Sequence, residues 1–134
     1  MALIWKDEYL VNVSVMDKQH RRLAELVGRL HETAESDSPD EGLFIALNEL
    51  VGFTRLHFAT EEELMLKYDF PGYAEHRAAH KEVLAGLQAL LTTVRDKVSV
   101  GFDPGGDIND DWVARHLLER DLDLGRYLNS RGVF

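Results

Sequence analysis

The sequence of 134 residues contains no cysteine. This absence excludes disulfides, thiolate metal ligands, iron–sulfur clusters and cysteine nucleophiles, so any metal ion must be held by nitrogen and oxygen atoms. It also fits a cytoplasmic protein, since disulfides persist mainly outside the reducing cytoplasm. No apolar run is long enough to span a bilayer, and the first residues lack the basic start and apolar core of a signal peptide. We therefore expect a cytoplasmic protein without a membrane span.

Basic residues are also few. Lysine and arginine number 15 against 24 aspartates and glutamates, which gives a formal net charge of −9. This charge opposes non-specific binding to nucleic acid and to anionic lipid, so we expect neither as a partner. The composition, 45% hydrophobic and 29% charged, is that of a folded globular protein, and the length suits one domain.

Proline occurs only three times, each time among glycine, aspartate or serine residues that favour turns. Pro39, Pro71 and Pro104 divide the chain into four segments, and core-type positions recur in each segment every three or four residues, as on one face of an α-helix. Alternation of period two is confined to Tyr9–Val15, so we expect residues 1–15 to form an extended N-terminal arm. The pattern predicts an all-α, up-down-up-down antiparallel four-helix bundle.

Polar residues interrupt the predicted core of every helix. In an antiparallel hairpin, two residues equally far from the turn lie at the same height. The pair His57 and His80 is centred just ahead of Pro71, and so is the pair Glu61 and His76. The same test places the remaining candidates within about one helical turn, ~5 Å, of that height. The full set is His20, His57, Glu61, His76, His80, His116 and Asp121.

Five imidazoles and two carboxylates at one height inside a bundle would be costly without a metal. Each buried polar group without a partner costs roughly 1–3 kcal/mol, against a total stability of about 5–15 kcal/mol for an ordinary domain. One divalent ion takes four to six ligands, so seven groups with two potentially bridging carboxylates predict a dinuclear centre. The ligand types favour iron, with manganese or zinc as substitutes.

The spacing of any single pair is weaker evidence for a metal site than the full set of seven residues. His57 with Glu61, or His76 with His80, would alone more often be a surface or capping pair than a metal site. Residues five apart lie about 140° apart around an ideal α-helix, so one centre can be reached from both only through a wide site or a widened turn. We therefore predict a π-type irregularity between His116 and Asp121.

Three further residues have competing interpretations. His31 follows His20 by eleven residues, about 16 Å along a helix axis, so it is too far away to bind the same centre and is read as structural or surface-exposed. Trp112 lies one turn before His116 and is either plain core or a wall of a ligand pocket. Trp5 is expected to pack the arm onto the bundle.

The motifs together resemble the hemerythrin family, and within it the single-domain bacterial hemerythrins. The similarity covers nearly the whole chain. It is carried by MDKQH at 16–20, HFATEE at 57–62, FPGY at 70–73, HRAAH at 76–80 and HLLERD at 116–121. The ordered set of ligand positions is far more specific than any one of these pieces.

The resemblance implies a single hemerythrin-like di-iron domain over residues 1–134. It implies two non-haem iron ions joined by an oxo or hydroxo bridge, with Glu61 and Asp121 also bridging them. One iron would be bound by His76, His80 and His116, and the other, which keeps an open position, by His20 and His57. The walls of the implied oxygen pocket are Leu23, Trp112, Val113 and Leu117.

The function implied is reversible dioxygen binding for oxygen storage or delivery, without enzymatic turnover. Neutral imidazoles stabilise ferrous iron, and the Glu-x-x-His pairs of oxygen-activating bundles are missing. The alternatives are an oxygen- or redox-sensing module and a di-iron enzyme that handles peroxide or nitric oxide. Storage is favoured because the sequence carries no output domain. An unidentified oxygen-consuming or signalling protein would be the partner in delivery or sensing. The glycine-rich segment Ser99–Asp111 departs from the family pattern and affects the expected oxygen affinity and autoxidation rate.

Overall fold

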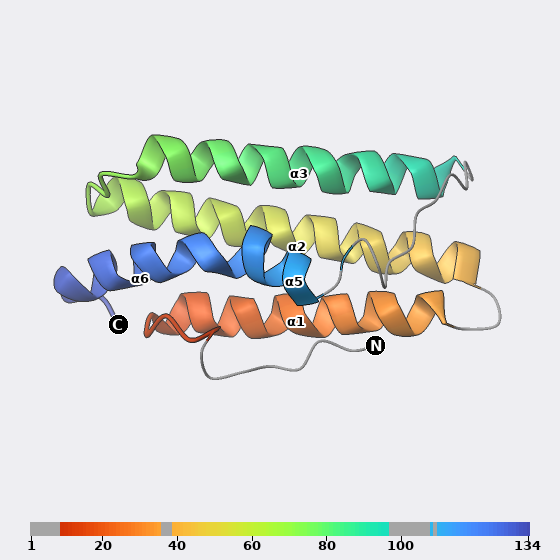
Figure 1. The fold of residues 1–134 in the computed structure, drawn as a ribbon, viewed down its shortest axis with the longest axis horizontal. Coiled ribbons are helices and arrows are strands. Elements are labelled where there is room, and N and C mark those ends of the chain that lie inside the picture. Colours follow the sequence, from red (N-terminus) through yellow and green to blue (C-terminus); the bar gives the residue numbers. More distant parts are fainter. Residues whose placement is uncertain (1–8, 36–38, 97–107, 109) are drawn as a thin grey trace.

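Four helical rods lie side by side in the computed structural model, which describes residues 9–35, 39–96, 108 and 110–134 (Figure 1). The first three rods are α1 (Ser14–Ala34), α2 (Pro39–Lys67) and α3 (Tyr73–Arg95). The fourth rod consists of three consecutive segments, α5 (Asp110–Val113), the π-helix η2 (Ala114–Leu118) and α6 (Glu119–Ser130). The described residues contain no strand. The predicted all-α four-helix bundle is confirmed.

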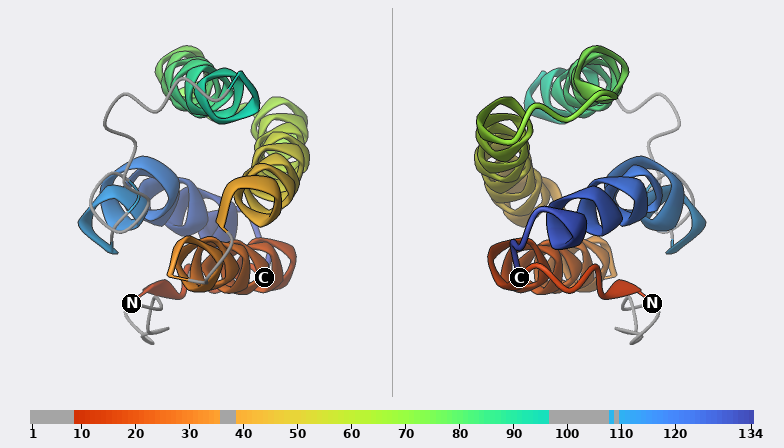
Figure 2. Two further views of the ribbon diagram at one scale, coloured as in Figure 1. Left: turned by 90° about the vertical axis from the view of Figure 1, so that its right-hand side faces the viewer. Right: turned by 90° about the vertical axis from the view of Figure 1, so that its left-hand side faces the viewer.

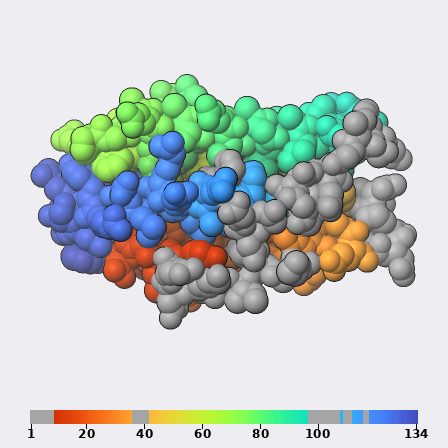
Figure 3. Space-filling view, viewed as in Figure 1, coloured from red at the N-terminus to blue at the C-terminus, as the bar shows by residue number. Residues whose placement is uncertain are grey.

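The rods alternate in direction and surround a common centre. Figure 2 looks along the bundle and shows α1, α2, α3 and the fourth rod placed in that order around it. In the space-filling view, α3, α6 and α1 close over one face of the molecule (Figure 3). Among the described helices, not one combines the length and the apolar character that crossing a bilayer would require.

The turn between α2 and α3 lies where Pro71 predicts a break. Asp69 takes a left-handed conformation with φ of 53°, and the backbone N–H of Phe70 donates to the carbonyl oxygen of Met65 at 2.9 Å. These are the features of a Schellman motif, which ends a helix by satisfying its last carbonyl groups. The hydroxyl of Tyr127 on α6 also donates to the carbonyl oxygen of Tyr68 at 2.6 Å. The turn is therefore fixed to the fourth rod.

The N-terminal arm is shorter than the alternating pattern predicts. The prediction of an arm over residues 1–15 is wrong at its end, because α1 begins at Ser14. The Asp17 carboxylate lies in the first turn of α1 and accepts a hydrogen bond from the backbone N–H of Val11 at 2.9 Å, an arrangement that favours helix initiation there. Trp5 lies outside the described residues.

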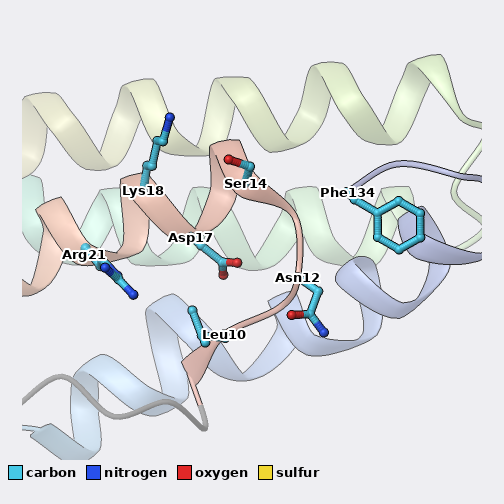
Figure 4. A pocket seen from close by; sticks show the side chains of 7 residues that line it. All are labelled: Leu10, Asn12, Ser14, Asp17, Lys18, Arg21 and Phe134. Atoms are coloured by element: carbon cyan, nitrogen blue, oxygen red, sulfur yellow. The ribbon is translucent and has the colours of Figure 1, made fainter.

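The described part of the arm packs against α6. Val11 and Val13 are buried, and a Cβ atom on Gly125 would lie 2.7 Å from the carbonyl oxygen of Val11. Only glycine permits this close approach. The arm, the first turns of α1 and the C-terminal residue also line a surface pocket that contains none of the predicted metal ligands (Figure 4). Its lining residues are Leu10, Asn12, Ser14, Asp17, Lys18, Arg21 and Phe134.

The buried apolar residues form two clusters. The smaller cluster contains Val11, Val13, Met16, Met65, Leu124 and Leu128. The larger cluster extends from Leu23 on α1 to Val113 and Leu118 on the fourth rod, and includes Phe58 on α2. Between Met16 and Leu23, and again between Leu118 and Leu124, the buried side chains are polar. The core is therefore divided by a polar layer, and the candidate metal ligands lie in it.

Candidate metal centre

Six of the seven predicted ligands meet in the polar layer. His20 comes from α1, two residues each come from α2 and α3, and Asp121 comes from α6. All six are buried, with His57 and Glu61 at 0% exposure. The members of this ligand layer are His20, His57, Glu61, His76, His80 and Asp121. His116 lies in η2, but its side chain is outside the described part of the structure.

The Glu61 carboxylate divides its two oxygens between two pairs of histidines. Its Oε1 lies 2.9 Å from Nε2 of His80 and 3.4 Å from Nε2 of His76. Its Oε2 lies 3.2 Å from Nε2 of His57 and 3.9 Å from Nε2 of His20. One oxygen thus faces the two histidines of α3, while the other faces the histidines of α1 and α2.

Asp121 repeats this division from the opposite rod. Its Oδ1 lies 3.1 Å from Nε2 of His76. Its Oδ2 lies 2.6 Å from Nε2 of His20 and 3.4 Å from Nε2 of His57. The layer therefore contains two groups of four potential ligand atoms, each group within 4.8 Å, and the same two carboxylates belong to both. Such an arrangement could hold a pair of metal ions with the carboxylates between them.

Several atoms of the layer have no hydrogen-bond partner although they are buried. They include both carboxylate oxygens of Glu61 and the Nε2 atoms of His76 and His80. Buried polar atoms without partners are costly, and ligation of a cation would satisfy them. The donor set, imidazole nitrogen and carboxylate oxygen, suits iron. The described residues therefore fit the metal pair that the sequence predicts.

The pKa values of the two buried carboxyl groups are shifted in opposite directions. Burial raises the pKa of Glu61 well above its usual 4.5, and the neighbouring Asp121 raises it further. Burial also acts to raise the pKa of Asp121, but interactions with Glu61 and with three histidines outweigh it and hold that pKa well below 3.8. In the metal-free protein, one carboxyl group of the layer thus favours its neutral form and the other its charged form.

The pKa values of the two α3 histidines are also shifted in opposite directions. Burial acts to lower the pKa of His76, but interactions with the nearby carboxyl groups of Asp121 and Glu61 outweigh it and raise the pKa from 6.5 to about 9. Burial lowers the pKa of His80 to about 3, and the positive charge of His76 adds to this effect. A proton on His76 therefore balances the charge of the Asp121 carboxylate in the metal-free layer, and a metal cation could take over that role.

Two residues that neighbour ligands in the sequence, Gln19 and Glu62, accept hydrogen bonds from histidine rings of the ligand layer. His57 Nδ1 donates to Oε1 of Gln19 at 2.7 Å, and Gln19 in turn donates to Thr60 at 3.1 Å. His80 Nδ1 donates to Oε2 of Glu62 at 3.2 Å. These bonds leave Nε2 of both rings as the atom that faces the layer, as metal-binding histidines require. The sequence analysis did not assign these roles, although Gln19 and Glu62 lie within the quoted motifs.

Replacing Gln19 by leucine should weaken metal binding by about 10- to 100-fold, because His57 would lose the acceptor that fixes its ring. A competitive titration with a chelator would measure this loss. Q19E retains an acceptor oxygen and should bind nearly as tightly as the wild type, and Q88L is a matched control because Gln88 is exposed on α3. An unchanged chelator midpoint for Q19L would contradict the proposed role.

The fourth rod contains the predicted irregularity. Residues Ala114–Leu118 form a π-helix, in which the backbone N–H of Glu119 donates to the carbonyl oxygen of Ala114, five residues earlier. The prediction from the spacing of His116 and Asp121 is confirmed. The wider turn inserts one extra residue before α6 and so changes the face on which Asp121 lies.

The predicted walls of the oxygen pocket lie mostly in the larger apolar cluster. Leu23 and Val113 are buried there, and Trp112 is half-buried against the same cluster. The side chain of Leu117 is outside the described part of the structure. His31, the histidine predicted not to bind metal, is buried at the far end of α1 and donates from Nε2 to the carbonyl oxygen of Ile108 at 2.6 Å, so its role is structural.

Comparison with known proteins agrees with this geometry. A family model described as the hemerythrin HHE cation binding domain matches residues 11–128. Bacteriohemerythrin of Stenotrophomonas maltophilia is 29% identical over 122 residues, which cover 86% of this chain and 74% of the relative. Bacteriohemerythrin of Pseudomonas aeruginosa is 30% identical over 122 residues, with coverages of 89% and 76%.

Similarity extends beyond the bacterial proteins. Myohemerythrin of Riftia pachyptila is 28% identical over 114 residues, which cover 85% of this chain and 83% of the relative. A crystal structure of wild-type hemerythrin shares the fold, with a TM-score of 0.81 at 23% identity over 96% of this chain and 98% of that one. The match of the family model over most of the chain shows that this protein belongs to the hemerythrin family.

Proposed function

We propose that this protein binds dioxygen reversibly at a non-haem di-iron centre and serves in oxygen storage or delivery. The observation that carries the proposal is the sharing of Glu61 and Asp121 between two groups of buried ligand atoms. Each carboxylate turns one oxygen toward each group, as bridging ligands between two ions would. The names of the relatives, bacteriohemerythrin and myohemerythrin, support the same function.

The proposed ligands divide unequally between the two ions. His76, His80 and, from its motif, His116 would bind one iron, whereas His20 and His57 would bind the other. The second iron then has fewer protein ligands and an open position for dioxygen. When bound, the pair of ferrous ions supplies the electrons that dioxygen takes up and that it returns on release.

The chain's own residues favour binding over turnover. Neutral histidines outnumber carboxylates in the proposed ligand set, which favours the ferrous state. Leu23 and Val113, buried beside the layer, would exclude water from the open position. Gln19 and Glu62 would keep the histidine rings in place during each binding cycle. For these reasons we propose a binding protein in preference to an enzyme.

An anaerobic titration of the ferrous-loaded protein with dioxygen tests this proposal. We expect a charge-transfer absorption band that appears with dioxygen and disappears when it is removed, together with two iron ions per chain by metal analysis. The metal-free protein is the control and should show no band. Rapid, irreversible oxidation would contradict carriage and favour redox sensing, while sustained consumption of peroxide or nitric oxide would favour an enzyme.

A further inference from the structure

Thr54 on α2 carries a hydroxyl group that the fold itself does not use. The side chain is buried at 0% exposure, and its Oγ1 has no hydrogen-bond partner. The other described buried polar residues are the members of the ligand layer and His31, which binds the carbonyl oxygen of Ile108. Because a buried hydroxyl without a partner is costly, Thr54 points to a partner outside the protein chain.

Other helical threonines show how this cost is usually avoided. On the same helix, Thr60 donates to the carbonyl oxygen four residues earlier at 3.1 Å. Thr33, Thr92 and Thr93 make the equivalent bond at 2.8 to 3.1 Å. The equivalent acceptor for Thr54 is the carbonyl oxygen of Leu50, yet Thr54 makes no such bond. Its hydroxyl is therefore left available within the core.

The position of Thr54 is next to the ligand layer. It precedes His57 by one turn on α2, while Leu23 follows His20 by one turn on α1. Because α1 and α2 run in opposite directions (Figure 1), both residues lie on the same side of the layer. This is the side of the larger apolar cluster, which contains Leu23 and Val113, two of the predicted walls of the oxygen pocket. Thr54 thus adds a polar group to an otherwise apolar level of the core.

We propose that the Thr54 hydroxyl is the hydrogen-bond donor of this pocket and holds the outer atom of a small ligand at the open iron position. The inference rests on the proposed function, since it places the ligand on the side of His20 and His57. The ligand is a small molecule whose outer atom accepts a hydrogen bond, such as dioxygen or a linear anion. Thr54 would then determine how long the ligand stays, and would favour ligands with an accepting outer atom over those without one.

The T54V variant tests the inference, because valine keeps the shape of threonine and removes the hydroxyl. Azide, a linear anion with an accepting outer atom, is the probe for the iron-loaded ferric protein. We expect azide to dissociate roughly two- to tenfold faster from T54V than from the wild type, the effect of losing one hydrogen bond. T54S keeps the hydroxyl and should remain within about twofold of the wild type. T92V, at an exposed threonine whose hydroxyl is bonded to the helix, is the control.

Thermal unfolding of the metal-free variants supplies a second readout. If the hydroxyl has no partner in the metal-free protein, T54V should melt at the same temperature as the wild type or higher. A lower melting temperature combined with unchanged azide dissociation would mean that a buried water is the partner, and would overturn the inference. Absence of azide binding by the wild type would overturn it as well. Faster azide loss from T54V in a protein that binds no dioxygen reversibly would refute the proposed function alone.

Discussion

E61Q should abolish the dinuclear centre, leaving at most one iron ion per chain and no reversible dioxygen band. Glu61 places one oxygen near the histidines of α3 and the other near those of α1 and α2, so no other described residue except Asp121 reaches both groups. Glutamine has nearly the same volume but only one weak oxygen ligand and no charge. Metal analysis after reconstitution, together with the optical titration, would measure the loss.

Two comparisons separate this effect from a folding defect. Since burial raises the pKa of Glu61, the metal-free wild type already favours a neutral side chain there, and metal-free E61Q should melt at a similar temperature. E63Q, an exposed neighbour on the same helix, should bind the normal amount of iron. If E61Q retained two iron ions and normal dioxygen binding, a bridging role for Glu61 would be excluded. D121N should likewise lose the dinuclear centre.

Removal of the metal should lower the melting temperature substantially. A ligand present at a thousand times its dissociation constant stabilises the folded state by about 4 kcal/mol, which for a domain of this size corresponds to a shift on the order of 10–20 °C. The bound ions would also satisfy the buried atoms of Glu61, His76 and His80 that otherwise lack hydrogen-bond partners. Calorimetry of the iron-loaded and chelated forms would measure the difference, and equal melting temperatures would contradict a metal centre in this layer.

The difference in melting temperature between the iron-loaded and the chelated protein should also depend on pH. His76 has a pKa raised to about 9 in the metal-free protein, so its contribution to stability is complete below pH 6.5 and is lost as the pH rises through about 9. Metal binding requires the unprotonated ring, so iron loading at neutral pH should release a proton from His76. His80, with a pKa lowered to about 3, should release none at that pH.

Lowering the pH should therefore reduce the extra thermal stability of the iron-loaded form. Protons compete with iron for the histidines and the carboxylates, so the gap between the two melting temperatures should narrow as the pH falls from 8 to 5. Proton release during loading can be measured by titration in buffers of different ionisation enthalpy. A gap that is constant with pH, or loading without proton release, would contradict this assignment of protons.

Much of the fold and of the candidate centre follows from the sequence because both depend on helical geometry. The three- and four-residue periodicity and the position of Pro71 predict antiparallel rods, and the fixed rise of a helix then predicts which residues share a height. This is why His57 and Glu61 lie at the level of His76 and His80 in the structure. The five-residue spacing before Asp121 predicts the π-helix for the same reason.

Features that depend on competition between an extended and a helical backbone, or on side-chain rotation, could not be predicted in this way. The alternation of Tyr9–Val15 suggests an extended chain, but the bond between Val11 and Asp17 accompanies a helix that starts at Ser14. Gln19 lies beside a ligand in sequence, and only the packing of α1 on α2 brings its amide to His57. The hydroxyl of Thr54 likewise depends on a rotamer that spacing does not determine.

The polar layer has a consequence for how the bundle opens. It divides the apolar interior into two clusters, and the smaller one includes the arm residues Val11 and Val13 as well as the end of α6. Each cluster is a potential cooperative unit, and the boundary between them is the level where protons and metal ions compete. Iron bound at this boundary would make the two units open together. Its loss would let the end of the bundle that holds the smaller cluster exchange its amide hydrogens independently of the rest.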